Sequence, residues 1–219
     1  MKALLLLVSL LLLPFTGSLI LNLGLLFSRY RSMSPGMLFC AGGFIFCFLV
    51  FALFGPPARS YVFEHEISHV FFAFLTGVKV KRMSVRKEGG SVETEKMNIL
   101  IALAPYALPL YAIVVFLLFS LLSLIAVSAA LEHLFHLAFG FALGFHILAT
   151  FHYIQVDQPD LKRYGYFSSL ILILTLTVVV VVLMLGLVFA GAQIFDYFGS
   201  SWSQTFRFYE KVYRLFPKR

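Results

Sequence analysis

Residues 37–54 read MLFCAGGFIFCFLVFALF, and this stretch contains no charged side chain. An apolar run of about 18 residues or more without charges is a candidate transmembrane helix, because roughly 20 residues cross the hydrocarbon of a bilayer. The whole chain agrees with this interpretation, since 61% of its 219 residues are hydrophobic and 12% are charged. Soluble domains carry about a quarter charged residues. The sequence therefore predicts an integral membrane protein.

Further segments that are wholly or mostly apolar lie on both sides of this stretch. Together with it they predict an all-α polytopic membrane protein with about six transmembrane helices, and the expected additional spans are 3–27, 61–77, 97–127, 131–153 and 166–194. The first run begins like a signal peptide. It continues past Pro14, however, and no A-x-A site closes it, so we interpret it as a retained span.

Two polar stretches have patterns of their own. Residues 78–96 are the most polar stretch. Val78 and Val80 alternate there with lysines, and Gly89-Gly90 follows, which predicts a small β-hairpin with its turn at the glycines. In the tail 200–219, aromatic residues recur every three or four positions, opposite charged ones, which predicts an amphipathic interfacial helix. These aromatic residues are Trp202, Phe206, Tyr209, Tyr213 and Phe216. We expect a single domain over 1–219, with its core at 61–194.

The chemistry of the chain is concentrated in His65-Glu66-Ile67-Ser68-His69, an H-E-x-x-H pattern. On a helix, positions i and i+4 share a face, so both imidazoles can bind one metal ion. Zinc favours nitrogen ligands and keeps one position open in catalytic sites. Glu66 is then placed to act as general base toward water. Ionisable residues in an otherwise apolar segment also indicate a functional site. We therefore expect His65 and His69 to be metal ligands and Glu66 to be catalytic.

This motif in a membrane segment resembles the site-2 protease family of intramembrane zinc metalloproteases. The likeness extends from EHEISHVFFAFLTGVKV at residues 64–80, through the paired glycines and Ala104-Pro105-Tyr106, to QPDLKRYG at 158–165. It implies that the third zinc ligand is an aspartate near the start of a later helix, which corresponds to Asp160. The chain lacks the N-P-x-x-P-x-D-G type sequence that most members carry at that place, and Asp157 is an alternative ligand.

The number of membrane crossings between His65 and Asp160 leaves a second set of candidates open for the third ligand. If 97–127 and 131–153 each cross the membrane once, Asp160 lies on the opposite face from His65, roughly 30 Å of hydrocarbon away. A break near Pro105 and Pro109 that makes 97–127 re-entrant would remove this difficulty. Otherwise the ligand comes from the start of the following helix, and the candidates there are Glu132, His133 and His136. His146, further along that helix, is either a packing residue or a residue that orients a ligand.

Together these features predict an intramembrane zinc metalloendopeptidase in a multi-pass protein of the cell membrane. Its partners would be a membrane-embedded or juxtamembrane protein or peptide substrate and the lipid bilayer. The net charge of +7 does not indicate nucleic acid, because basic residues in membrane proteins gather in loops and fix topology. A non-proteolytic zinc-site protein of regulatory or chaperone-like type is the main alternative, and a metal or proton transporter is a further one.

Overall fold

The computed structural model describes residues 2–28, 34–86, 89–125, 128–155, 159–189 and 192–215. They form two compact units. The first unit combines Met1–Ser32 with Leu161–Arg219, and the second unit is Met33–Asp160. The expectation of a single domain over 1–219 stays a prediction.

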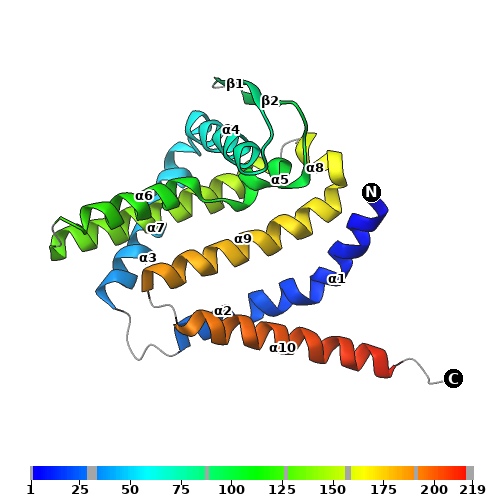
Figure 1. Ribbon diagram of the computed structural model, residues 1–219. Coiled ribbons are helices and arrows are strands. Elements are labelled where there is room, and N and C mark those ends of the chain that lie inside the picture. The colour runs from blue at the N-terminus through cyan, green and yellow to red at the C-terminus, as the bar shows by residue number, and fades with distance from the viewer. Residues whose placement is uncertain are drawn as a thin grey trace. The chain divides into compact units, whose positions relative to one another are not determined.

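The described residues are mainly helical, with one pair of strands (Figure 1). The β-hairpin packs against α4 at an edge of the second unit, and α8 begins at the end of that unit. In chain order the elements are α1 (Lys2–Leu21), α2 (Leu23–Ser28), α3 (Pro35–Phe54), α4 (Ala58–Leu75), β1 (Val80–Arg86), β2 (Gly89–Thr94), α5 (Ile99–Ala107), α6 (Leu110–Leu122), α7 (Ala129–Tyr153), α8 (Pro159–Tyr164), α9 (Tyr166–Phe189) and α10 (Ala192–Arg214).

Among the described residues, the helices that are long and apolar enough to cross a membrane are α1, α3, α7 and α9. Helices α5 and α6 are bent by 71° relative to each other and add a fifth candidate if the pair counts as one span. Helix α4, which corresponds to the predicted span 61–77, is not among them, because Arg59, Glu64 and Glu66 interrupt its apolar sequence. The structure thus supports an all-α membrane protein, while the predicted number of six spans is not shown.

Helices α3 and α7 lie side by side and run in the same direction. A side chain at Gly140 of α7 would collide with the backbone of Cys40 of α3. Further along both helices, a Cβ at Gly144 would lie 3.2 Å from that of Cys47. Glycines at such crossings let two helix backbones approach closely in lipid. The G-x-x-x-G spacing of Gly140 and Gly144 therefore serves helix packing, as its pattern indicates.

We expect Gly43→Ala to destabilise this helix pair, because a Cβ at Gly43 meets the backbone carbonyl of Leu137. Overpacking of this kind costs about 1–3 kcal/mol. The neighbouring Gly42 is a matched control, since a Cβ there meets only the Leu137 side chain, at 4.0 Å. Thermal unfolding in detergent should show a lower midpoint for Gly43→Ala and an unchanged one for Gly42→Ala. Equal midpoints for both variants would contradict the close crossing.

Helix α6 runs antiparallel to α7. Phe119 stacks on Phe135 with ring centroids 4.0 Å apart, and Tyr111 contacts Phe145 at 5.3 Å. Helix α7 therefore ends where α6 begins and where α3 ends. The stacking of Tyr153, the last residue of α7, on Tyr61 of α4 at 4.2 Å confirms this placement.

This arrangement removes the topological difficulty posed by Asp160. Helix α4, the hairpin and α5 all come between the end of α3 and the start of α6, and α6 then runs back from that end of α3 toward the start of α7. Asn98 caps the start of α5, where its side chain accepts a hydrogen bond from the amide of Ile101. The chain then breaks at Leu108 and Pro109. One of the two alternatives that the sequence left open required a break near Pro105 and Pro109. The chain does break at Pro109, whereas Pro105 lies inside α5.

The predicted hairpin is present as an antiparallel pair of β1 and β2, with a register irregularity between Val80 and Arg82. Gly89 and Gly90, however, do not form its turn. They pair with Arg86 and Val85 as the first residues of β2. The prediction of a glycine turn is therefore wrong. Gly90 is needed instead for a close contact with α4.

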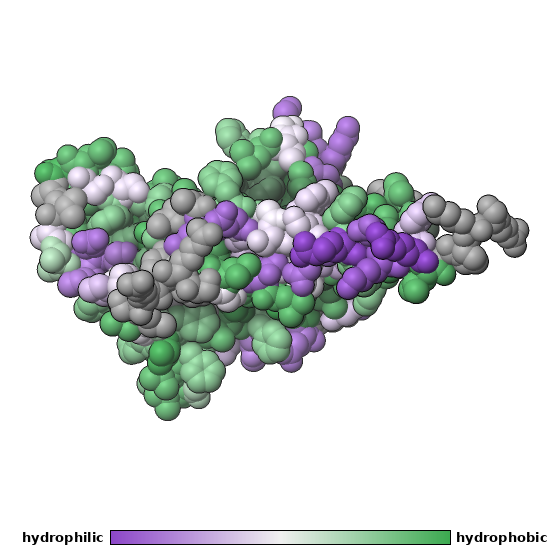
Figure 2. Space-filling model, turned by 90° about the horizontal axis from the view of Figure 1, so that it is seen from below, coloured by the Kyte–Doolittle hydropathy of each residue, from purple (hydrophilic) through white to green (hydrophobic). Residues whose placement is uncertain are grey.

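In the first unit, α1 packs along α9, and the hydroxyls of Thr16 and Thr175 lie 2.6 Å apart. Helix α10 begins earlier than the predicted tail and is amphipathic. The face of the molecule seen in Figure 2 carries a group of hydrophilic side chains among apolar ones. The packed face of α10 consists of Tyr197, Ser201 and Thr205, and the Tyr197 hydroxyl donates to the carbonyl of Leu19. The predicted aromatic side of the tail stays largely exposed, with Trp202, Phe206 and Tyr213 at 65–70% exposure. Phe216 lies outside the described residues.

Candidate metal centre

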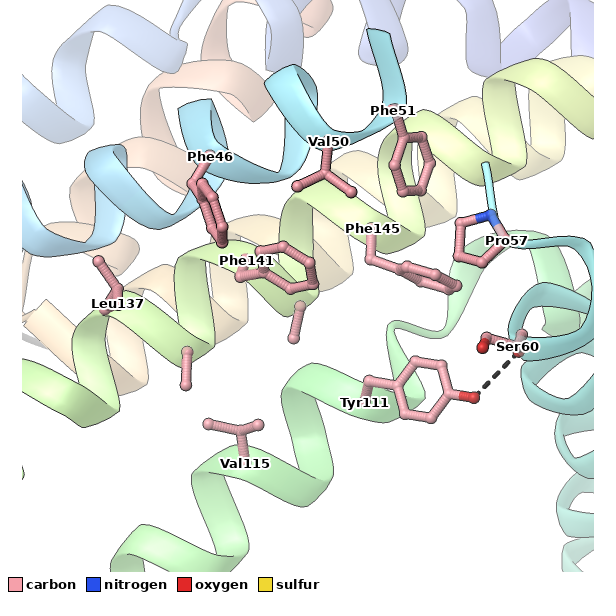
Figure 3. A pocket seen from close by; sticks show the side chains of 12 residues that line it. Phe46, Val50, Phe51, Pro57, Ser60, Tyr111, Val115, Leu137, Phe141 and Phe145 are labelled. Carbon is pink, nitrogen blue, oxygen red and sulfur yellow. Dashed lines mark hydrogen bonds between the residues drawn. The ribbon is translucent and has the colours of Figure 1, made fainter. Parts of the chain in front are cut away.

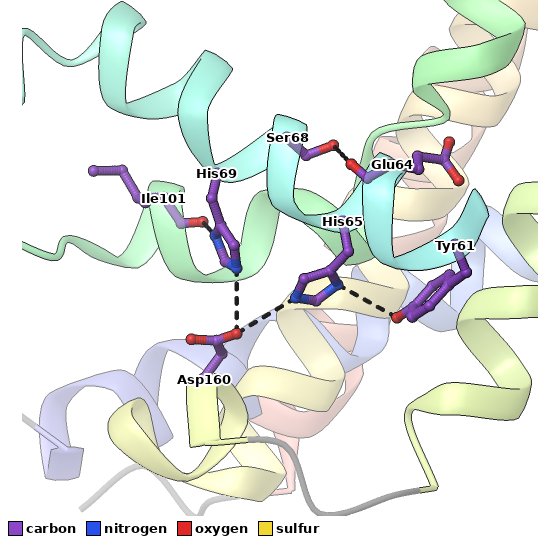
Figure 4. A network of polar contacts seen from close by, with 7 residues as sticks. All are labelled: Tyr61, Glu64, His65, Ser68, His69, Ile101 and Asp160. Atoms are coloured by element: carbon purple, nitrogen blue, oxygen red, sulfur yellow. Dashed lines mark hydrogen bonds and ion pairs between the residues drawn. The ribbon is translucent and has the colours of Figure 1, made fainter. Parts of the chain in front are cut away.

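Three side chains from distant parts of the second unit converge on one point (Figure 4). His65 and His69 lie on the same face of α4, and Asp160 lies in the first turn of α8. One ligand atom from each can be chosen so that all three lie within 4.8 Å of one another. Within the residues that the structure describes, no other group of three or more His, Cys, Asp or Glu side chains meets so closely. These three residues can hold a metal ion.

The separations fit a shared ion better than direct hydrogen bonds. Oδ2 of Asp160 lies 3.6 Å from Nε2 of His65 and 3.4 Å from Nε2 of His69. A charge-assisted hydrogen bond would be shorter, at about 2.7–2.9 Å. Metal–ligand bonds of about 2.0–2.1 Å at tetrahedral angles place neighbouring ligand atoms about 3.3 Å apart. The observed distances are close to that edge length.

The outer ring nitrogens of both histidines have partners that orient the rings. Nδ1 of His69 lies 2.7 Å from the carbonyl oxygen of Ile101 on α5, and it must donate in that contact. The Tyr61 hydroxyl lies 3.4 Å from Nδ1 of His65. When Nδ1 carries the proton, the lone pair of Nε2 is free for a metal, and metal-binding histidines in proteins show this arrangement.

The environment of Asp160 keeps its carboxylate ionised. Burial alone would raise the pKa of Asp160, but its contacts with the imidazoles of His65 and His69 outweigh this effect and hold the pKa below its usual range. Metal ligands must be deprotonated. Asp160 therefore meets both the geometric and the electrostatic requirement for a third ligand.

Glu66 is buried in the same helix, between the two histidines in sequence and 5% exposed. Its Oε2 atom has no hydrogen-bond partner among the described residues. Strand β2 lies directly against this side chain, and a Cβ at Gly90 would collide with Cγ and Oε1 of Glu66. The carboxylate is thus held beside the metal ligands with one oxygen left available. Gly90 was not recognisable as a site residue from sequence, where it reads as a turn glycine.

The alternative ligands from the start of α7 are not brought to this place. His133 stacks on Phe39 of α3, with ring centroids 4.3 Å apart. Nδ1 of His136 contacts the backbone carbonyl of Glu132 at 2.8 Å. None of the three belongs to the convergent group. Asp157 lies outside the described residues.

A separate apolar pocket of about 680 Å³ lies between α3, α6 and α7 (Figure 3). Its walls include Phe46, Phe141 and Phe145, and at one end the Tyr111 hydroxyl donates to the carbonyl of Ser60 at 2.9 Å. None of its lining residues belongs to the metal-binding group. The side chains that can hold a metal ion therefore lie on α4 and α8 and not in this pocket.

Comparison with known proteins adds no relative. The chain matches no protein-family model, and no curated protein or solved structure is significantly similar to it. Its class is therefore defined by fold and site alone, as a helical, membrane-type protein with a buried two-histidine, one-aspartate group that can hold a metal ion. Membership in the site-2 protease family stays a prediction.

Proposed function

We propose that the chain is a zinc metalloendopeptidase that hydrolyses peptide bonds of membrane-embedded or juxtamembrane substrates. The observation that carries the proposal is the convergence of His65, His69 and Asp160 around one point, with Glu66 buried next to them. Two histidines and one carboxylate suit zinc and leave a coordination position open, as hydrolytic sites require. A purely structural zinc site would have four protein ligands and no use for Glu66.

In this proposal His65, His69 and Asp160 bind the metal, Glu66 transfers the proton and Gly90 positions Glu66. His65, His69 and Asp160 hold the ion, which when bound supplies Lewis acidity toward the scissile carbonyl and lowers the pKa of water. Glu66 accepts a proton from the attacking water and passes it to the leaving amine. Gly90 keeps the Glu66 carboxylate in place by close backbone contact. A substrate helix must unwind locally before attack, because its carbonyls are otherwise hydrogen-bonded within the helix.

The distribution of basic residues supports a cytoplasmic position for the centre. The segment between α3 and α5, which carries the H-E-x-x-H motif, contains seven basic residues, Arg59, Lys79, Lys81, Arg82, Arg86, Lys87 and Lys96. Residues 123–128, between α6 and α7, contain none, and the segment between α2 and α3 contains only Arg29 and Arg31. Cytoplasmic loops carry the excess of lysine and arginine. The end of the second unit that bears the metal ligands is therefore the cytoplasmic one.

The proposal is tested by metal removal. Purified protein in detergent should cleave a model single-span substrate, lose this activity after treatment with a zinc chelator, and regain it when one equivalent of zinc is added. Chelated protein with zinc replaced by magnesium is the control, because magnesium prefers oxygen ligands and octahedral geometry. Cleavage that survives complete metal removal would refute a metallopeptidase.

We expect Gly90→Ala to reduce turnover by about tenfold or more, since a misplaced catalytic group of the order of 1 Å costs up to about a hundredfold. Zinc content should not change, because the side chain would displace Glu66 and not the ligands. Ser91→Ala, at the exposed next position of β2, is the matched control. Turnover equal to wild type in Gly90→Ala would show that the hairpin does not position Glu66.

A further inference from the structure

A second buried carboxylate stands immediately before the H-E-x-x-H motif. Glu64 is 1% exposed and has no place among the metal ligands. In Figure 4 its side chain points away from Asp160. A charged group inside a membrane protein is costly and indicates a function. The peptidase chemistry proposed above does not use this carboxylate.

The contacts of Glu64 join three helices. Its Oε1 accepts a hydrogen bond from the backbone amide of Tyr111, the second residue of α6, at 3.4 Å. The same oxygen lies 3.5 Å from Nδ1 of His146 on α7, which is also 1% exposed. The pair therefore connects α4 with the start of α6 and with the middle of α7.

The contact with α6 has the form of a helix cap. The first amides of a helix have no partner within the helix, and a carboxylate at that end also interacts favourably with the helix dipole. The residue in the N-cap position of α6 is Pro109, which makes no side-chain capping bond. Glu64 supplies the missing acceptor from a different helix. It thus stabilises the start of α6 just after the 71° bend.

The bend in turn places α5, which orients one of the metal ligands. Helix α5 carries the Ile101 carbonyl that contacts Nδ1 of His69, and Ile101 is fully buried. Displacement of the junction between α5 and α6 would move that carbonyl and with it the imidazole ring. A change in such an outer partner typically costs 10–100-fold in metal affinity or activity.

We propose that Glu64 is a positioning residue which, held by His146, caps α6 across the break and so fixes the orientation of His69 at the metal centre. The inference rests on the proposed function for its kinetic consequence. Its structural consequence concerns the geometry of the bound metal and is measurable without any cleavage.

The test uses the full-length protein loaded with cobalt, whose visible absorption reports ligand geometry. We expect Glu64→Ala to change the band positions or intensities of the cobalt spectrum and to lower kcat about 10–100-fold with KM little changed. Glu64→Gln should restore both, because an amide oxygen can still accept from the Tyr111 amide. His146→Ala should change the spectrum in the same direction, and His152→Ala, an exposed histidine on the same helix, should not.

Each outcome decides the matter. A wild-type spectrum in Glu64→Ala overturns the proposal, and so does a Glu64→Gln variant that is altered as much as the alanine variant. If Glu64→Ala does not fold, the other two variants still test the proposal. The cobalt spectrum of Glu64→Gln must then be near that of wild type, and the spectrum of His146→Ala must be altered. If wild type gives the expected cobalt spectrum without cleaving any substrate, the proposed function fails while the positioning role is still tested by the spectra.

Discussion

Asp160→Ala is expected to weaken zinc binding by about a hundredfold or more. Removal of a residue that merely hydrogen-bonds a metal ligand already lowers metal affinity about 10–100-fold, and loss of a ligand should lower it at least as much. Asp160 provides the third atom of the convergent group, at 3.4 Å and 3.6 Å from the two histidine nitrogens. Without it two imidazoles remain, which is one ligand fewer than hydrolytic zinc sites have. Metal analysis of protein purified at low zinc should therefore find little zinc in the variant, and cleavage should be lost with it.

Matched variants separate Asp160 from the ligands that the sequence left open. Asp157→Ala removes a carboxylate three positions earlier, and His133→Ala removes an imidazole that stacks on Phe39. Both should keep full zinc content. Zinc binding that persists in Asp160→Ala and disappears in one of these controls would assign the third ligand differently.

Glu66→Gln is expected to separate metal binding from chemistry. The amide is nearly isosteric with the carboxylate but cannot take a proton from water, and a positioned general base contributes about 10²–10⁴-fold. Turnover should fall by that factor while zinc content stays at the wild-type level, since Glu66 is not among the converging ligands. Both quantities can be measured on one preparation.

The exposed carboxylate of Glu93 provides the control, because Glu93→Gln makes the same chemical change on β2 away from the centre. This variant should retain wild-type turnover. If Glu66→Gln cleaves as fast as wild type, the carboxylate is not the base. A non-proteolytic zinc site or a transporter, the two alternatives that the sequence leaves open, would then gain weight.

The sequence predicts those parts of the molecule that follow local rules. The apolar run at 37–54 becomes α3, and the i, i+4 spacing of His65 and His69 places both rings on one face of α4. The hairpin and the break near Pro109 follow equally from residue type. The assignment of Asp160 as third ligand rests on the family resemblance. Its position next to the histidines could not be derived from sequence spacing, because that position depends on where α7 ends.

Other features depend on long-range contacts that leave no local signal. The contact of His69 with Ile101 uses the backbone carbonyl, so the residue type at position 101 does not indicate it. From sequence Gly90 is expected to be a turn residue, and its close contact with the Glu66 side chain becomes evident only from the structure. Tyr61 is the exception, because its position four residues before His65 places it on the same helix face. Helix α4 was expected to cross the membrane, whereas its charged residues exclude it from the span-length apolar helices.

We propose that this chain hydrolyses peptide bonds in membrane substrates at the His65, His69 and Asp160 centre. The most direct test is mass spectrometry of the products after incubation of purified wild-type protein with a single-span substrate in ¹⁸O-labelled water. We predict two complementary fragments, cut in or beside the apolar segment, with ¹⁸O in the new carboxyl terminus. Glu66→Gln should form both fragments about 10²–10⁴-fold more slowly. Intact substrate with zinc-loaded wild-type protein would rule out peptide-bond hydrolysis, and equal amounts of fragments from Glu66→Gln would rule out Glu66 as the base.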